Sequence, residues 1–310
     1  MPEPDTEGAS PRYADLETWP AATMMQAMWE GQLAAVAAVQ PALPALAEAA
    51  EAAAARLRRG GRLAYAGAGT SGRIGVQDGA ELAPTFDWPA DRLVLLMAGG
   101  EAALIRAVEN AEDRADLALD DVTQAGLGRD DVLVGLAASG GTPYTVGCVV
   151  AARAAGALTI GVANSPGTRL LGAAEHKVLL ETGPEAVAGS TRMKAGTAQK
   201  VALNLFSTAL MTSLGRVYRG QMVDMVARNA KLRRRALRML QALTGAGPEQ
   251  AEAALGQAGG RVKAAILVVR GHAPAEADAL LVRHGGDLRR VDAALAAALA
   301  ATLAPRCPPA

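Results

Sequence analysis

Five short apolar segments that alternate with helical patterns are the feature that most constrains how this chain of 310 residues can fold. The segments occupy residues 62–66, 92–98, 131–137, 157–163 and 177–181. Short apolar strands are typical of a parallel sheet that is covered on both faces. Their alternation with helices predicts an α/β fold in which such a sheet lies between two layers of helices.

The patterns divide the chain into three regions. We predict an N-terminal arm with helices over 1–60, a sheet domain over 61–219 and a small all-helical domain over 220–310, with a boundary near Arg219. The first helical pattern, over 21–59, is interrupted at Pro41 and Pro44. In the sheet domain, we expect an acidic helix over 101–119 and a long helix over 193–214. After Gly220 the strand patterns stop, and five helices are predicted over 222–243, 249–258, 261–269, 275–284 and 288–303.

Composition excludes several classes of protein. Hydrophobic residues make up 51% of the chain and charged residues 20%, which excludes a disordered chain. Lys+Arg and Asp+Glu both number 31, and a net charge of zero argues against binding to nucleic acid. Two Cys and three His, widely spaced, predict neither a disulfide framework nor a zinc site. Without a signal peptide or an apolar run of about 20 residues, we expect a cytoplasmic protein that does not enter a membrane.

A glycine loop follows the first predicted strand. Gly67, Gly69 and Gly72 have the spacing of a dinucleotide fingerprint, in which glycines let the backbone approach a phosphate at a helix start. A dinucleotide site also needs an acid after the next strand, and Glu101 lies well beyond the expected spacing of about 20 residues. The loop therefore fits a phosphate site better than a dinucleotide site.

Hydroxyl side chains and glycines recur at three turns that follow strands. The sequence predicts that ligand-binding residues gather there, because ligand sites of open α/β sheets lie at the carboxyl ends of the strands. Hydroxyls and backbone N–H groups together suit a phosphorylated sugar. The alternative is ordinary helix capping, for which Ser and Thr are preferred. The candidate residues are Gly69, Thr70, Ser71, Ser139, Gly140, Thr142, Ser190, Thr191 and Lys194.

Carboxylates are the candidates for proton transfer, because His and Cys are scarce. Asp78 and Glu81 lie three residues apart on one predicted helix, and Glu109 and Glu112 do so on the next, beside Asp113. Glu81 has small or apolar sequence neighbours, which would raise its pKa if they buried it. The alternative is that all these acids lie on solvated helix faces.

Several segments closely resemble the signature segments of N-acetylmuramic acid 6-phosphate etherases. The residues involved are 66–73, 138–144, 188–200, 222–225, 247–255 and 284–286, and the stretch from Gly189 to Lys200 is the most specific. The resemblance implies a sugar isomerase (SIS) domain followed by a small helical domain of the ubiquitin-associated type. It also implies a homodimer, and apolar residues of the helix over 193–214 favour the same state: Val201, Leu203, Leu205, Leu210 and Met211.

The resemblance implies a lyase of cell-wall sugar recycling. Such an enzyme cleaves the D-lactyl ether of N-acetylmuramic acid 6-phosphate to N-acetylglucosamine 6-phosphate and D-lactate. By position, the family's two catalytic glutamates correspond to Glu81 and Glu112. The elimination needs two carboxylates and oriented hydroxyls, and no metal or redox cofactor.

Three other functions are compatible with parts of this pattern. A non-enzymatic sugar-phosphate sensor with an SIS domain would keep the hydroxyl turns but would not need both Glu81 and Glu112. An aldose–ketose isomerase would use similar turns and a base, but would release no lactate. A nicotinamide dehydrogenase would need the ribose-binding acid that the sequence lacks.

Overall fold

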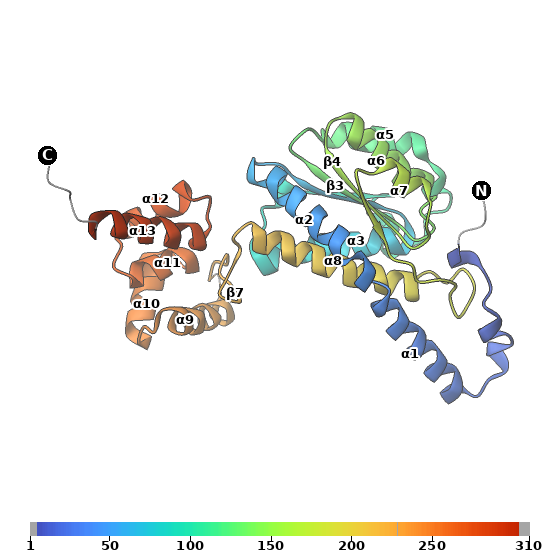
Figure 1. Cartoon of the computed structure of the whole chain (residues 1–310), viewed down its shortest axis with the longest axis horizontal. Coiled ribbons are helices and arrows are strands. Elements are labelled where there is room, and N and C mark those ends of the chain that lie inside the picture. The colour runs from blue at the N-terminus through green and yellow to red at the C-terminus, as the bar shows by residue number, and fades with distance from the viewer. Residues whose placement is uncertain (1–4, 228, 304–310) are drawn as a thin grey trace, which may run out of the picture. The chain divides into compact units, whose positions relative to one another are not determined.

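The computed structural model describes residues 5–227 and 229–303, and the chain forms two compact units (Figure 1). One unit comprises residues up to Ala83 together with Trp88–Leu210, and the other comprises Pro84–Asp87 and the residues from Met211 onward. The domain boundary predicted near Arg219 lies within the second unit. It stays a prediction, because compactness alone does not test which segment folds independently.

A five-stranded parallel sheet forms the centre of the first unit. The strand order is β2-β1-β3-β4-β5, and every neighbouring pair is parallel. All five predicted strands are confirmed, and their ends agree with the predicted ones to within two residues. Their bounds are β1 Leu63–Gly67, β2 Leu93–Met97, β3 Val132–Ala137, β4 Leu158–Ala163 and β5 His176–Leu179.

Helices cover both faces of this sheet, as the sequence predicts (Figure 1). One layer consists of α5 Ala115–Ala125, α6 Pro143–Ala154 and α7 Arg169–Ala173. The other contains α2 Leu43–Arg58, α3 Gly69–Phe86 and α8 Lys194–Ser213. Strand β1 is buried along its whole length, and its side chains alternate between the layers: Ala64 and Ala66 pack in the core cluster that includes Ala118 and Val149.

The N-terminal region consists of three short 3-10 helices and α1 Ala21–Ala37. The 3-10 helices are η1 Asp5–Glu7, η2 Pro11–Tyr13 and η3 Leu16–Thr18. Pro41 lies in η4 Gln40–Ala42, which separates α1 from α2, whereas Pro44 lies in the first turn of α2 and does not interrupt it.

The stretch Ala21–Arg58 is long and apolar enough to cross a membrane by length and composition alone, because an 18-residue window within it has a mean hydropathy of 1.4. The sequence did not predict this result. Core helices of soluble proteins pass the same test, and η4 divides the stretch into helices of 17 and 16 residues. One face of α2 is buried, including Leu46, Ala50 and Leu57.

The single acidic helix predicted over 101–119 is wrong. The chain forms α4 Ala102–Ile105, an extended segment, η6 Ala111–Asp113 and then α5. Arg106 is extended, and Asn110 adopts the left-handed conformation with φ of 60°, which ends helical geometry at both points. Glu109 and Glu112 therefore do not share a helix face.

The second unit contains five helices, as predicted, but the first begins later than expected. A short antiparallel hairpin of β6 Val217–Tyr218 and β7 Gln221–Met222 precedes them. Its two turn residues, Arg219 and Gly220, both have positive φ, as a tight hairpin requires. The prediction that strands stop after Gly220 is thus wrong for β7. The five helices are α9 Ala230–Thr244, α10 Pro248–Gln257, α11 Val262–Val269, α12 Pro274–Arg283 and α13 Leu288–Leu303. One further 3-10 helix, η5 Ala90–Arg92, belongs to the first unit and precedes β2.

A partly buried hydrogen-bond network joins the sheet to α3 and α8. The Tyr65 hydroxyl donates to Asp78 Oδ2 at 2.7 Å, and the Ser207 hydroxyl donates to Asp78 Oδ1 at 3.1 Å. Burial raises the pKa of Asp78 above its usual range, although the hydrogen bonds from Tyr65 and Ser207 oppose the shift.

We predict that Asp78→Asn changes the pH dependence of stability. A carboxyl with a raised folded-state pKa contributes stability that is fully present below its unfolded pKa of about 4 and is lost as pH rises through the folded pKa. Asn keeps an acceptor for Tyr65 and a donor for Ser207. The free energy of unfolding of the variant, relative to wild type, should therefore rise between pH 4 and pH 7 in urea titrations. A pH-independent difference, equal to that of the exposed Asp120→Asn control, would contradict the expectation.

Candidate functional site

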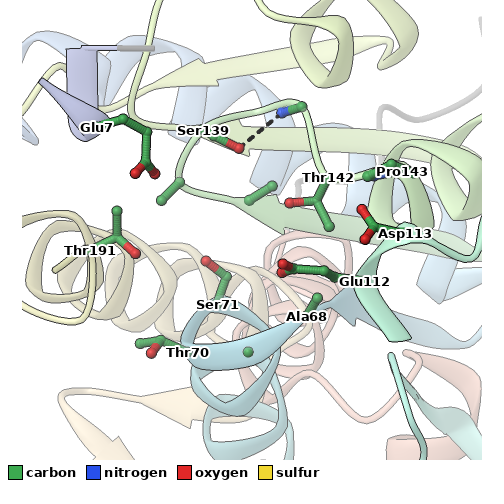
Figure 2. A pocket seen from close by; sticks show the side chains of 14 residues that line it. Glu7, Ala68, Thr70, Ser71, Glu112, Asp113, Ser139, Thr142, Pro143 and Thr191 are labelled. Carbon is green, nitrogen blue, oxygen red and sulfur yellow. Dashed lines mark hydrogen bonds between the residues drawn. The ribbon is translucent and has the colours of Figure 1, made fainter. Parts of the chain in front are cut away.

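A pocket of about 380 Å³ opens at the carboxyl ends of β1 and β3 (Figure 2). These strands are neighbours, and the chain leaves β1 for β2 on one side and returns to β3 on the other. Such a switch point is where open α/β sheets bind their ligands. The pocket is lined by Glu7, Ala68, Gly69, Thr70, Ser71, Glu112, Asp113, Ala137, Ala138, Ser139, Gly141, Thr142, Pro143 and Thr191.

Two helix starts supply polar groups to the pocket. Ser71 lies in the first turn of α3, and Thr142 is the N-cap residue of α6. The side chain of Thr142 makes no capping hydrogen bond, and the Ser139 hydroxyl accepts a bond from the backbone N–H of Gly141 at 3.2 Å. Helix starts present unpaired N–H groups and a positive dipole end, which favour an anion. Capping by the side chain therefore does not explain Thr142.

Carboxylates lie on opposite sides of these hydroxyls. Figure 2 shows Glu112 and Asp113 on one side of the pocket and Glu7 with Thr191 on the other. Glu112 and Asp113 come from η6, which is anchored by the buried Ala111. Neither acid forms a hydrogen bond or ion pair with another residue in the described part of the chain. Both therefore have free acceptor atoms for a ligand.

The third predicted turn contributes only Thr191 to the pocket. Ser190 and Lys194 do not line it. The Lys194 ammonium donates to the carbonyl oxygen of Thr182 at 2.7 Å, and burial lowers its pKa. Lys194 thus stabilises the loop before α8 rather than facing the pocket.

An internal carboxylate occupies the start of α8. Glu185 is almost fully buried, and its two oxygens accept hydrogen bonds from the N–H groups of Lys194 and Ala195, at 2.9 and 3.0 Å. A negative charge at a helix N-terminus is stabilising, so Glu185 takes the place that an anionic ligand could occupy there. It fixes the loop that carries Thr191.

Gly140 is also absent from the pocket lining, and its role is structural. It has φ of +62°, and a Cβ atom at this position would lie 2.3 Å from Thr168 Oγ1. Glycine is therefore required for the turn after β3 to approach Thr168. Of the predicted binding residues, the structure brings together Gly69, Thr70, Ser71, Ser139, Thr142 and Thr191, with the predicted acid Glu112.

Glu81 lies outside the pocket. It is exposed on α3, ten residues after Ser71, which corresponds to about 15 Å along the helix axis. The small and apolar neighbours of Glu81 in the sequence do not bury its side chain within the same chain. Leu82 is buried, but Glu81 is exposed together with the flanking Ala80 and Ala83. The acid of this helix that is partly buried is Asp78.

Cys148 does not compete with these acids as a reactive group. Cys148 is buried in α6, and burial raises its pKa to about 12, so the thiolate is absent at neutral pH. Cys307 lies outside the described residues.

The sequence analysis assigned no role to three acids of this region: Glu7, Asp113 and Glu185. Asp113 was noted only as a neighbour of Glu112, and Glu7 lies far from the site in sequence. Glu185 precedes the predicted helix by eight residues, too far for a local capping signal, so no pattern in the sequence singled it out.

Comparison with known proteins decides the family. Residues 45–153 match the family described as glucokinase regulatory protein N-terminal SIS domain. An N-acetylmuramic acid 6-phosphate etherase of Deinococcus radiodurans is 52% identical to this chain over 92% of the chain and 94% of its own length. One from Streptomyces avermitilis is 44% identical, with 94% of both chains covered. This chain belongs to the N-acetylmuramic acid 6-phosphate etherase family.

Family membership confirms the fold class and the resemblance read from the signature segments. It makes the chain an enzyme of the etherase type and favours a lyase over a non-enzymatic sensor. Among solved structures, that of a phosphoheptose isomerase from Francisella tularensis aligns over 63% of this chain and 100% of its own, at 19% identity and a TM-score of 0.47.

We predict that Glu185→Ala destabilises the first unit. The substitution leaves one buried and one partly buried N–H group without their charged acceptor, and hydrogen bonds to charged groups contribute about 1.5–3 kcal/mol each. A loss of at least ~2 kcal/mol is expected in urea unfolding. Glu181→Ala, at an exposed position four residues earlier, should lose little. Equal stability of the two variants would refute this role for Glu185.

Proposed function

We propose that the pocket binds N-acetylmuramic acid 6-phosphate and that Glu112 is a catalytic carboxylate for cleavage of its D-lactyl ether. The products are N-acetylglucosamine 6-phosphate and D-lactate. The single observation that carries the proposal is the position of Glu112, which faces the hydroxyls and helix starts at one switch point of the sheet. Relatives with up to 52% identity bear the name of this activity.

The 6-phosphate is held by hydroxyls and backbone N–H groups. Ser71, Ser139 and Thr142 lie together between the starts of α3 and α6. No Lys or Arg is among the described residues that line the pocket. The helix dipoles and N–H groups therefore supply the positive potential for the phosphate, and Gly69 and Thr70 complete the loop around it.

Elimination followed by hydration accounts for the products. Opening of the sugar ring exposes an aldehyde at C1, which acidifies the proton on C2. A carboxylate removes this proton, the C3–O bond breaks, and the lactyl oxygen leaves with a proton from an acid. Water then adds across the C2–C3 double bond, with its hydroxyl at C3 and a proton at C2. One acid–base pair serves both halves of the reaction.

Glu112→Gln should lower lactate release by about 10²–10⁴-fold, because removal of a general acid or base typically costs this much. The substrate KM should change little, since the phosphate contacts remain. Lactate is measured with a coupled dehydrogenase assay. Glu109→Gln is the matched control, because Glu109 is exposed three residues away and does not line the pocket.

The assay also separates the rival functions. Wild-type protein that binds the sugar phosphate without releasing lactate would support a sensor. Conversion of an aldose phosphate to a ketose phosphate without lactate would support an isomerase. Near wild-type release by Glu112→Gln would remove Glu112 from the mechanism while leaving the reaction itself in place.

The protein is proposed to act as a cytoplasmic homodimer. Contrary to the sequence argument, Leu203, Leu210 and Met211 of α8 are buried within the chain, and Leu205 is exposed. A more extensive apolar stripe lies on α1, where Met25, Trp29, Leu33 and Val36 are 47–65% exposed at helical spacing. Exposed apolar surface of this extent is typical of a protein interface.

Glu81, predicted from the sequence as the principal acid–base residue, is proposed to act in the pocket of a second copy. Its position on α3, about three turns from the pocket of its own chain, argues against action in cis. A twofold dimer gives each copy the same opportunity to supply Glu81 to its partner.

Mixed dimers test this arrangement. Glu81→Gln and Glu112→Gln should each be nearly inactive alone. After dissociation and reassociation of an equal mixture, random pairing leaves about a quarter of the pockets with both acids if Glu81 acts in trans. Lactate release should recover to that level. No recovery, with hybrids verified by mass spectrometry, would show that both acids act from the same chain. An active Glu81→Gln variant before mixing would show that Glu81 is dispensable.

A further inference from the structure

The N-terminal arm supplies one acid to the pocket. Among the described residues that line the pocket, Glu7 is the only one that precedes β1. It lies across from Glu112, on the side of Thr191 (Figure 2). Neither the proposed phosphate site nor the proposed acid–base pair uses it.

Buried neighbours fix the arm that carries Glu7. Thr6, the preceding residue, is fully buried, and Leu16 further along the arm is 7% exposed. Arg12 forms an ion pair with Glu30 of α1 at 2.5 Å, which joins the arm to that helix. The position of Glu7 is therefore set by packing on both sides of it.

Glu7 also lies against the loop that leads to Thr191. A Cβ atom at Gly189 would lie 3.0 Å from Glu7 Oε2, and Gly189 has φ of +73°. Glycine thus provides both the backbone conformation and the space for the carboxylate. The Glu7 side chain is exposed to the pocket and forms no hydrogen bond or ion pair with another described residue.

A carboxylate in this place selects the part of the ligand that it can contact. An ionised carboxylate only accepts hydrogen bonds, and it repels a phosphate or a second carboxylate. The proposed substrate carries both of these anionic groups, at C6 and on the lactyl substituent. The group that Glu7 can contact is therefore a hydrogen-bond donor of the sugar, either a ring hydroxyl or the N–H of the acetamido group.

We propose that Glu7 is a substrate-binding residue that accepts a hydrogen bond from a hydroxyl or amide N–H of the sugar. This inference rests on the proposed function, because it takes the bound phosphate at Ser71, Ser139 and Thr142 as given. The arm then binds the sugar, while the helix starts bind the phosphate. Experiments can measure the sugar contacts and the phosphate contacts separately.

The test compares two inhibitors in Glu7→Ala and Glu7→Gln. Loss of a hydrogen bond to a charged group corresponds to about a tenfold or greater loss of affinity. In Glu7→Ala, KM for the substrate and the inhibition constant of N-acetylglucosamine 6-phosphate should rise about tenfold. The inhibition constant of inorganic phosphate should stay the same or fall, because a negative charge has been removed. The kcat value should remain within a few-fold of wild type.

Two further variants calibrate the result. Ser71→Ala should weaken inhibition by inorganic phosphate, which shows that the assay detects the phosphate contacts. Glu17→Gln removes an exposed charge from the same arm outside the pocket and should behave as wild type.

Three outcomes would overturn the proposal for Glu7. They are unchanged constants in both Glu7 variants, an equal loss of affinity for sugar phosphate and inorganic phosphate, or a fall in kcat with KM unchanged. The last would make Glu7 an acid–base group instead of a binding residue. Absence of lactate release by the wild type is a different result, since it would refute the proposed function itself.

Discussion

The parallel pairing of β1 with β3 is the interaction on which the site depends. In this register Gly67 lies opposite Leu136, so both strands end at the same level. The starts of α3 and α6, which follow these strands, then converge on one pocket. Close contact between Gly67 and Gly72 allows α3 to begin there, because a Cβ on Gly67 would lie 2.7 Å from the Gly72 Cα. Without this approach the α3 N–H groups would point elsewhere.

The N-termini of three helices in this unit, α3, α6 and α8, are satisfied in two different ways. The start of α8 is satisfied internally by Glu185, which is buried and accepts two backbone hydrogen bonds. The starts of α3 and α6 face the pocket, and Thr142 leaves its capping capacity unused. Because a carboxylate already neutralises α8, the anion-binding potential is concentrated at the other two. The third hydroxyl turn, Ser190-Thr191, therefore lines the pocket only through Thr191 and forms no second anion site.

Acids surround this anion site from elements that are distant in sequence. Glu7 comes from the N-terminal arm, Glu112 and Asp113 from η6, and Glu81 lies on α3 outside the pocket. Carboxylates near a phosphate cradle lower its affinity for free anions, but they accept protons and hydrogen bonds from a sugar. The arrangement suits a ligand with one anionic end and a polar, neutral ring.

Local patterns in the sequence determined the five strands, most of the helices and the turns that carry Ser71, Ser139 and Thr142, because hydrophobic periodicity and glycine placement are local properties. Tertiary structure alone decided the rest. The helix predicted over 101–119 breaks because Asn110 adopts a left-handed conformation and Val108 packs on Gly99. Glu7 lines the pocket and Glu81 lies outside it. Both positions are set by how the chain packs, which spacing along the sequence does not predict.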